Sequence, residues 1–189
     1  DDQETVKINW GTKLSFFGVK TFLGGAERFE TIVNALQLLK DDIELVAVHD
    51  ACRCCATDQL VVDVIAKAAE TGAAIPAAPV TATIKQVKDG QIIKTVDRSD
   101  LFEAQTPQVF DVALLKKAYA NLPNVDKSAV TDDAFLVEAI GHRVSIVESD
   151  SSNLKITRPS DIAIAEAVLK SRPKPKPEGG INPFAEAEW

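Results

Sequence analysis

The sequence predicts an α/β protein with a mostly parallel sheet and a projecting β-hairpin arm. Short apolar runs at 44–48 and 73–78 are typical of buried parallel strands, and a segment of helical periodicity separates them. A strand, a helix and a second strand in this order predict a right-handed crossover within a parallel sheet. The arm is indicated by Lys88-Asp89-Gly90 between two strand-like runs, because an Asp-Gly pair is typical of a tight hairpin turn.

The first half of the chain is expected to contain strands and two helices. Strand-like pieces occur at 6–8, 14–17 and 19–23. Gly24-Gly25 then precedes a helix, and Thr57 is a suitable N-cap for a second helix. The first of these helices carries apolar residues on one face, namely Phe29, Ile32, Val33, Leu36 and Leu39.

The second half is expected to continue the sheet and its covering helices. Gly141 is a suitable residue to end a helix, and Pro159 is suitable as the first residue of another. The expected strands are 82–87, 91–96, 101–105 and 144–147, and the expected helices are about 111–120, 132–140 and 159–170. One domain over 1–170, with an arm at about 82–98, is therefore expected to precede a Pro- and Lys-rich tail at 171–189, which we expect to dock on its own chain or on a partner.

Composition narrows the class of protein. The 189 residues contain 21 Lys and Arg against 28 Asp and Glu, and this formal charge of −7 argues against a general nucleic-acid binder. Neither a membrane-spanning apolar run nor a signal peptide is visible, so we expect a cytoplasmic protein without a membrane partner. The chain begins at Asp1 and has no Met, which leads us to expect that an N-terminal part is absent.

Asp50 directly follows an apolar strand, and ligands of open α/β sheets bind beyond the carboxyl ends of strands. A carboxylate there could hold Mg²⁺ or a ribose hydroxyl, and Arg53 could meet a phosphate. The alternative is that Asp50 only caps the following turn. Position along the chain leaves both interpretations open.

The Cys and His residues near Asp50 are not predicted to bind metal. His49, Cys52, Cys54 and Cys55 form a single group, whereas structural zinc sites usually draw ligand pairs from two segments. We therefore interpret the three cysteines as reduced, small apolar residues.

Hydroxyl and basic side chains recur at the edges of the predicted elements. Together they suit a phosphomonoester ligand, although each one taken singly also fits a solvated charge or a helix cap. The residues of this set are Thr83, Lys85, Arg98, Thr106, Thr131 and Lys155.

Seven segments in order resemble the 2-C-methyl-D-erythritol 4-phosphate cytidylyltransferase family, and the resemblance extends from about Leu23 to Lys170. Gly24-Gly25-Ala26-Glu27-Arg28 also suits this family. The seven segments are Val48-His49-Asp50-Ala51-Cys52-Arg53, Ala78-Pro79-Val80, Thr83-Ile84-Lys85, Thr95-Val96-Asp97-Arg98, Gln105-Thr106-Pro107-Gln108-Val109-Phe110, Thr131-Asp132-Asp133 and Asn153-Leu154-Lys155-Ile156-Thr157-Arg158-Pro159.

The resemblance implies a Rossmann-like α/β nucleotidyltransferase domain over 1–170 that joins CTP to methylerythritol phosphate and releases pyrophosphate with Mg²⁺. It implies that Arg98 and Lys155 are catalytic and that Asp50 is a metal ligand. It also implies a homodimer, in which the arm carries Thr83 and Arg98 into the neighbour's site. The implied methylerythritol phosphate contacts are Thr83, Thr106 and Thr131, and the implied CTP contacts are Gly25, Thr31, Asp50, Ala51 and Arg53.

The chain departs from the family pattern at its start. The family's glycine-rich loop, with the Arg and Lys that cradle the triphosphate, has no counterpart here. The 189 residues alone are therefore expected to be nearly inactive, because a lost transition-state contact costs about 10²–10³ in rate. Two alternatives stay open: a ribitol 5-phosphate cytidylyltransferase, and a catalytically dead, loop-less binding or dimerisation module.

Overall fold

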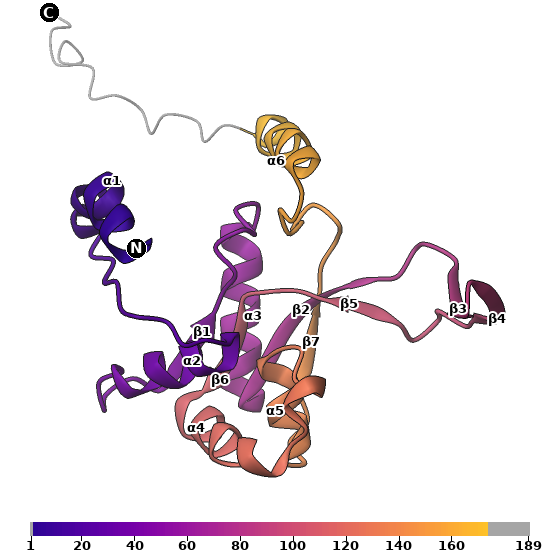
Figure 1. Ribbon diagram of the computed structural model, residues 1–189, viewed down its shortest axis with the longest axis horizontal. Coiled ribbons are helices and arrows are strands. Elements are labelled where there is room, and N and C mark those ends of the chain that lie inside the picture. The colour runs from indigo at the N-terminus through magenta and orange to yellow at the C-terminus, as the bar shows by residue number, and fades with distance from the viewer. Residues whose placement is uncertain (1, 174–189) are drawn as a thin grey trace, which may run out of the picture.

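The computed structural model describes residues 2–173, so the predicted tail lies outside the described residues from 174 onward. Figure 1 shows the order and arrangement of the elements. The helices are α1 (Asp2–Phe16), α2 (Arg28–Gln37), α3 (Asp58–Thr71), α4 (Val112–Ala120), α5 (Asp133–Ala139) and α6 (Pro159–Ser171). The strands are β1 (Leu45–Val48), β2 (Ala73–Pro79), β3 (Ile84–Lys88), β4 (Gln91–Val96), β5 (Phe102–Ala104), β6 (Gln108–Asp111) and β7 (Ser145–Glu148).

The central sheet is mixed, and most of its strands run in one direction. β7 pairs with β2 in parallel, whereas β1 and β2 both pair with β6 in antiparallel register. β1, β2 and β7 therefore share one direction, while β5 and β6 run the opposite way. The α/β class with a mainly parallel strand direction is thus confirmed, although β6 lies between the two strands that the sequence places next to each other.

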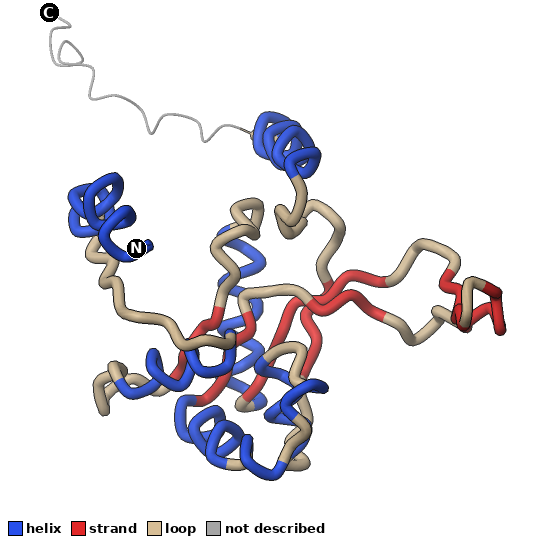
Figure 2. Tube along the Cα trace, in the orientation of Figure 1, coloured by secondary structure: helices blue, strands red, loops and turns tan. Residues whose placement is uncertain are grey.

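Helices cover both faces of the sheet, as the tube in Figure 2 shows. Ala73, Ile75 and Phe110 point to one face and pack with α2, α4 and α5. Ala74 and Val109 point to the other face and pack against α3. This alternation is the two-residue period of a strand, and it explains why β2 is apolar along its length.

The helix ends follow the expected capping chemistry. The Thr57 hydroxyl accepts a hydrogen bond from Leu60 N–H at the start of α3, as predicted. Gly141 follows α5 with a φ of 80°, a left-handed conformation that suits a residue without a side chain.

The arm forms a separate two-stranded sheet of β3 and β4, which projects from the main body (Figure 1). Its turn has positive φ at both Asp89 (51°) and Gly90 (75°). Positive φ at both central residues is the geometry that the Asp-Gly pair predicts for a tight hairpin.

The expectation of strands at 6–8, 14–17 and 19–23 is wrong, because residues 2–16 form the helix α1 and residues 19–23 belong to no helix or strand. α1 lies apart from the sheet (Figure 1), so no neighbouring strand is available to pair with it. An unpaired segment can satisfy its backbone groups through its own helical hydrogen bonds, and local bonding therefore replaces the predicted strands.

The sequence also missed β6, because Gln108–Asp111 is short and follows a proline. This strand is paired on both sides and contributes Phe110 and Val109 to the two cores.

Among residues 2–173, no helix is long and apolar enough to cross a bilayer.

Candidate active site

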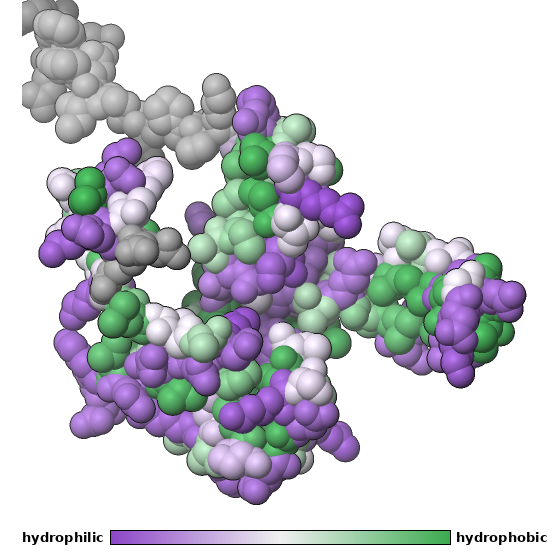
Figure 3. Space-filling view, viewed as in Figure 1, coloured by the Kyte–Doolittle hydropathy of each residue, from purple (hydrophilic) through white to green (hydrophobic). Residues whose placement is uncertain are grey.

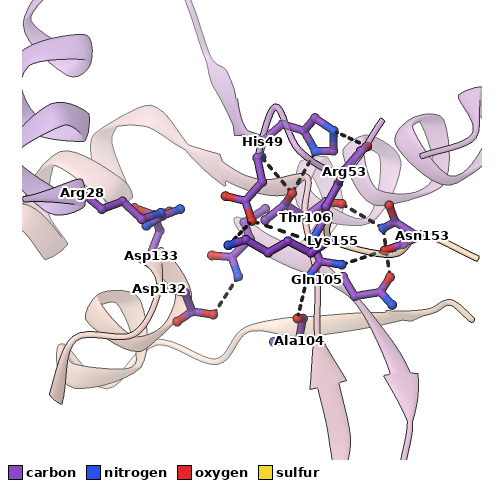
Figure 4. A network of polar contacts seen from close by, with 12 residues as sticks. Arg28, His49, Arg53, Ala104, Gln105, Thr106, Asp132, Asp133, Asn153 and Lys155 are labelled. Carbon is purple, nitrogen blue, oxygen red and sulfur yellow. Dashed lines mark hydrogen bonds and ion pairs between the residues drawn. The ribbon is translucent and has the colours of Figure 1, made fainter. Parts of the chain in front are cut away.

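The site forms where the strands of the central sheet bring their ends together. β1 ends at Val48 and is followed by His49 and Asp50. β6 runs antiparallel to β1 and pairs Gln108 with Val48, so the residue two positions before β6, Thr106, meets the carboxyl end of β1. The loop after β7 reaches the same edge, because β7 runs parallel to β1 and β2. Residues far apart in the sequence thus converge at one place (Figure 4).

Asp50 is the acidic centre of this cluster. Its Oδ2 lies 3.0 Å from Lys155 Nζ and 3.7 Å from Arg53 Nε. Burial alone would raise the pKa of Asp50, but the hydrogen bond and charge of Lys155, assisted by Arg28 and Arg53, outweigh it and lower the pKa. The Asp50 side chain contacts basic groups from two loops, so it does more than cap a turn.

Arg53 is held firmly beside Asp50. Its Nη1 donates to the Asn153 carbonyl oxygen (2.7 Å) and its Nη2 to that of Ala104 (3.5 Å). Its Nε is buried without a hydrogen-bond partner among the described residues. Ala51 lies exposed in the intervening turn. The predicted CTP residues of this loop are therefore grouped together with Lys155.

Thr106 connects the loop after β1 to the start of β6. It is 5% exposed, and its Oγ1 accepts a hydrogen bond from Asp50 N–H (3.0 Å). The same oxygen lies 2.9 Å from His49 Nδ1. His49 Nε2 donates to the Arg53 carbonyl oxygen (3.2 Å), so in a neutral ring Nδ1 accepts from the Thr106 hydroxyl. His49 was not among the predicted site residues, and only its place beside Asp50 could have suggested it.

The Gly24-Gly25 loop is shaped by side chains of α2. Gly25 N–H donates to Thr31 Oγ1 (2.9 Å), and Ala26 N–H donates to Glu30 Oε2 (2.8 Å). A Cβ on Gly25 would lie 2.2 Å from Glu30 Cβ, so only glycine fits at this position. The predicted residues Gly25, in this loop, and Thr31, on α2, are thus hydrogen-bonded to each other and not to the Asp50 cluster.

Thr131 borders a hollow of about 510 Å³ and is exposed. The N-cap of α5 is Asp132, whose side chain accepts from Phe135 N–H (3.0 Å). The alternative that Thr131 itself caps this helix is therefore wrong, and its hydroxyl remains available to a ligand. Arg28 and Lys127 line the same hollow and give it positive charge.

A buried polar group that the sequence did not reveal connects α2 to α5. Asp133 is 0% exposed, and its Oδ2 lies 2.6 Å from Arg28 Nη2, while its Oδ1 accepts from the Tyr119 hydroxyl. Burial, followed by the negative charge of Asp133, raises the pKa of Tyr119 strongly, so the hydroxyl stays protonated and donates. In the sequence, only Arg28 could have pointed to this buried pair, because it is a charged residue next to an apolar helix face. Its partner Asp133 lies 105 positions away, so the sequence does not reveal which residue it pairs with.

The arm does not bring Thr83 and Arg98 into the cluster of their own chain. Both are exposed, and the Arg98 guanidinium donates to the Thr81 carbonyl oxygen next to the arm. Within residues 2–173, no hydrogen bond or ion pair joins either residue to Asp50 or Lys155.

The cysteines and histidines do not assemble a metal centre in the described part of the chain. No group of three or more His, Cys, Asp or Glu there is arranged to hold a metal ion. Cys55 is buried, Cys54 is exposed and Cys52 is half-buried, and all three are free.

A mixed α/β sheet whose strand ends collect one carboxylate, two basic side chains and a buried hydroxyl belongs to the class of α/β enzymes that handle anionic ligands. Comparison with known proteins defines the class further. A sequence profile described as 2-C-methyl-D-erythritol 4-phosphate cytidylyltransferase matches residues 7–171.

Curated relatives and solved structures agree with this profile. The cytidylyltransferase of that name from Bacillus cereus is 42% identical over 156 residues, which are 82% of this chain and 68% of the relative. The one from Nostoc sp. is 46% identical over 156 residues, with the same shares of both chains. The crystal structure of the Thermus thermophilus enzyme superposes with a TM-score of 0.73 at 34% identity, covering 81% of this chain and 74% of that one.

A crystal structure of a 4-diphosphocytidyl-2C-methyl-D-erythritol synthase gives a TM-score of 0.74 at 36% identity, covering 85% of this chain and 77% of that one. The chain belongs to the 2-C-methyl-D-erythritol 4-phosphate cytidylyltransferase family. It is therefore a nucleotidyltransferase of isoprenoid biosynthesis. The ribitol phosphate enzyme and the dead binding module are not favoured by these matches.

Proposed function

We propose that the cluster around Asp50 is the place where CTP and 2-C-methyl-D-erythritol 4-phosphate react. The observation that carries this proposal is the grouping of Asp50, Arg53 and Lys155, which come from two loops at one edge of the sheet. A phosphate oxygen of methylerythritol phosphate attacks the α-phosphorus of CTP, a new P–O bond forms, and pyrophosphate leaves with the electrons of the broken bond. This in-line transfer asks the protein mainly for positioning and charge neutralisation.

No strong general base is needed, because the attacking phosphate is already an anion. The difficulty is instead the repulsion between two polyanionic substrates. Lys155 and Arg53 offset this repulsion at the Asp50 cluster, and Arg98 does so from the arm. Arg98 and Lys155 are accordingly assigned to the methylerythritol phosphate group, which they position for attack on the α-phosphorus of CTP.

The remaining assignments divide the site into two halves. CTP is contacted by two segments of the chain. The first carries Gly25 and, at the start of α2, Thr31. The second is the loop after β1, with Asp50, Ala51 and Arg53. Methylerythritol phosphate is contacted by three threonine hydroxyls. These are Thr106 in the cluster, Thr131 beside the basic hollow, and Thr83 from the arm.

The residues present fit a Mg²⁺ ion that arrives with CTP. Mg²⁺ is usually held by one or two carboxylates together with substrate phosphates, and Asp50 offers one half-buried carboxylate with a lowered pKa. When bound, the ion neutralises charge on the triphosphate. Asp50 is the residue that holds it.

The arm supports the proposal of a homodimer. It projects from its own domain (Figure 1) and carries apolar side chains that Figure 3 shows as green patches on the projecting part. Val87, Ile92 and Ile93 are 56%, 64% and 58% exposed. A second copy that covers these side chains also receives Thr83 and Arg98, so each active site draws residues from both chains.

The test is Arg98→Ala in the full-length protein, with initial rates measured at varied concentrations of each substrate. We expect a large loss in kcat/KM for methylerythritol phosphate and little change in the Kd for CTP. Lys94→Ala, also exposed on the arm, is the matched control and keeps full activity. An unchanged kcat/KM for Arg98→Ala removes this residue from the site. The substrate is tested separately, by incubating the unmutated protein with CTP and each sugar phosphate in turn. Pyrophosphate release with ribitol 5-phosphate alone overturns the assigned substrate.

A further inference from the structure

Asn153 is a buried polar residue in the loop that follows β7. It is 2% exposed, and its Nδ2 donates two hydrogen bonds, to Gln105 Oε1 (2.9 Å) and to the Thr106 carbonyl oxygen (3.0 Å). Gln105 is itself held by Ser149, whose hydroxyl donates to the same Oε1 (2.9 Å). A single amide therefore fixes the loop after β7 onto the segment that leads into β6.

The main chain around Asn153 is anchored to the loop after β1 as well. The Asn153 carbonyl oxygen accepts from Arg53 Nη1 (2.7 Å), and three residues later Ile156 N–H donates to the Cys52 carbonyl oxygen (2.9 Å). Lys155 lies between these two anchors. Its side chain is 45% exposed and its only ion pair among the described residues is with Asp50, so the backbone on either side determines where its ammonium group lies.

We propose that Asn153 is a positioning residue for the transfer reaction, which holds the loop that carries Lys155 so that its ammonium group lies in a fixed place beside Asp50. This inference rests on the role proposed above for Lys155. Asn153 itself contacts neither substrate. It acts through the ammonium group of Lys155, because its amide sets the separation between the loop after β7 and the start of β6.

Replacing Asn153 is expected to slow the reaction, because it displaces the ammonium group of Lys155. Replacing Asn153 by Ala leaves the buried Thr106 carbonyl oxygen without its Asn153 donor and leaves Gln105 Oε1 with Ser149 alone, so the loop shifts to satisfy the Thr106 carbonyl. A displacement of about 1 Å at a reacting group costs roughly 100-fold in rate. The loss is expected in kcat, while the KM for CTP changes little, because the misplaced ammonium group of Lys155 acts on the attacking phosphate of methylerythritol phosphate.

The experiment is a double-mutant cycle in the full-length enzyme, comprising the wild type, Asn153→Ala, Lys155→Ala and the double variant. If Asn153 acts through Lys155, the double variant is no slower than Lys155→Ala by more than about 2-fold, because the second change has nothing left to misplace. Losses that multiply across the cycle overturn the inference, since they show that Asn153 supports the enzyme independently of Lys155. Full kcat in Asn153→Ala overturns it as well.

The same cycle separates this inference from the proposed function. Unchanged activity in Lys155→Ala refutes the proposed role of Lys155 itself. A slow Lys155→Ala together with a fast Asn153→Ala refutes only the positioning role. Gln105→Met, which removes one of the two acceptors of the Asn153 amide at nearly constant size, lowers kcat in the same direction should Asn153→Ala fail to fold. Asn124→Ala, at an exposed asparagine bonded to Asn121, is the matched control with wild-type kcat.

Discussion

At the scale of single residues, the cluster around Asp50 combines charge and burial in a way that makes it sensitive to pH. Lys155 contacts the carboxylate at 3.0 Å, and its positive charge keeps the pKa of Asp50 below its ordinary value in spite of burial. A group whose pKa is lowered by folding stabilises the fold when it is ionised. This contribution is present above the pKa of the unfolded chain and is lost as the pH falls through the lower folded pKa.

Asp50→Asn is therefore expected to lower the free energy of unfolding at neutral pH and to make no difference in strong acid. The difference between the two proteins begins to shrink below the ordinary Asp pKa of about 3.9. Urea titrations at a series of pH values measure it. A difference that grows on acidification contradicts the lowered pKa of Asp50.

Asp133 provides a second prediction at this scale, because it is fully buried with two partners. Asp133→Asn removes the charge that Arg28 pairs with, and we expect a loss of about 2 kcal/mol in the free energy of unfolding. Tyr119→Phe removes only one hydrogen bond and is expected to cost about 1 kcal/mol. Glu70→Gln breaks an exposed pair with Lys67 and serves as the control with little effect. If all three variants are equally stable in urea, the contacts of Asp133 with Arg28 and Tyr119 do not stabilise the fold.

At the scale of elements, the loop before α2 depends on one glycine. Ala26 and Glu27 N–H groups both donate to Glu30 Oε2 at the start of this helix, which pulls the loop against the helix. Gly25 then lies so close to Glu30 that an added Cβ would approach its Cβ to 2.2 Å. The position of this loop thus depends on both the capping carboxylate and the missing side chain.

Gly25→Ala is expected to displace this loop and to weaken CTP binding at least several-fold in the full-length protein. Isothermal titration of CTP measures the change. Gly11→Ala is the matched control, because a Cβ there meets only Lys7 Cγ at 3.7 Å, and it leaves CTP affinity unchanged. Wild-type CTP affinity in Gly25→Ala would remove this loop from the nucleotide site.

At the scale of the whole molecule, the residues of the proposed site are divided between the core and the arm. The core supplies Asp50 and Lys155, whereas Thr83 and Arg98 belong to the projecting arm and its connections (Figure 1). In the proposed homodimer, a second copy covers the exposed apolar side chains of the arm. Assembly and activity are therefore expected to be lost together.

Ile92→Asp is expected to convert a dimer of the full-length protein into a monomer, because it introduces a charge into the apolar surface of the arm. Sedimentation velocity measures the change, and activity is expected to fall in parallel. Ile162→Asp, at an isoleucine on α6 that is 51% exposed, is the matched control that remains dimeric. A wild-type protein that sediments as a monomer at assay concentrations overturns the proposed dimer.

Elements with strong local signals could be predicted from the sequence. The Asp89-Gly90 turn, the Thr57 cap and the apolar run of β2 each follow from chemistry within a few residues, and all three are confirmed. The strands expected at 6–8, 14–17 and 19–23 are absent, because strand formation depends on a partner strand that the sequence does not indicate. β6 was missed for the same reason, since its pairing with β1 and β2 is what makes Gln108–Asp111 a strand.

The sequence by itself determined the fold class and the resemblance to the cytidylyltransferase family, and it singled out Asp50 and Arg53 as candidate site residues, because motifs and periodicity are local properties of the chain. Only the tertiary structure decided which side chains meet. The Asp50–Lys155 pair spans 105 positions, and the Asn153 amide bonds to Gln105 and Thr106 across more than 45. Such contacts depend on the antiparallel insertion of β6 and on the common direction of β1, β2 and β7, and strand direction is fixed only when the whole sheet has packed.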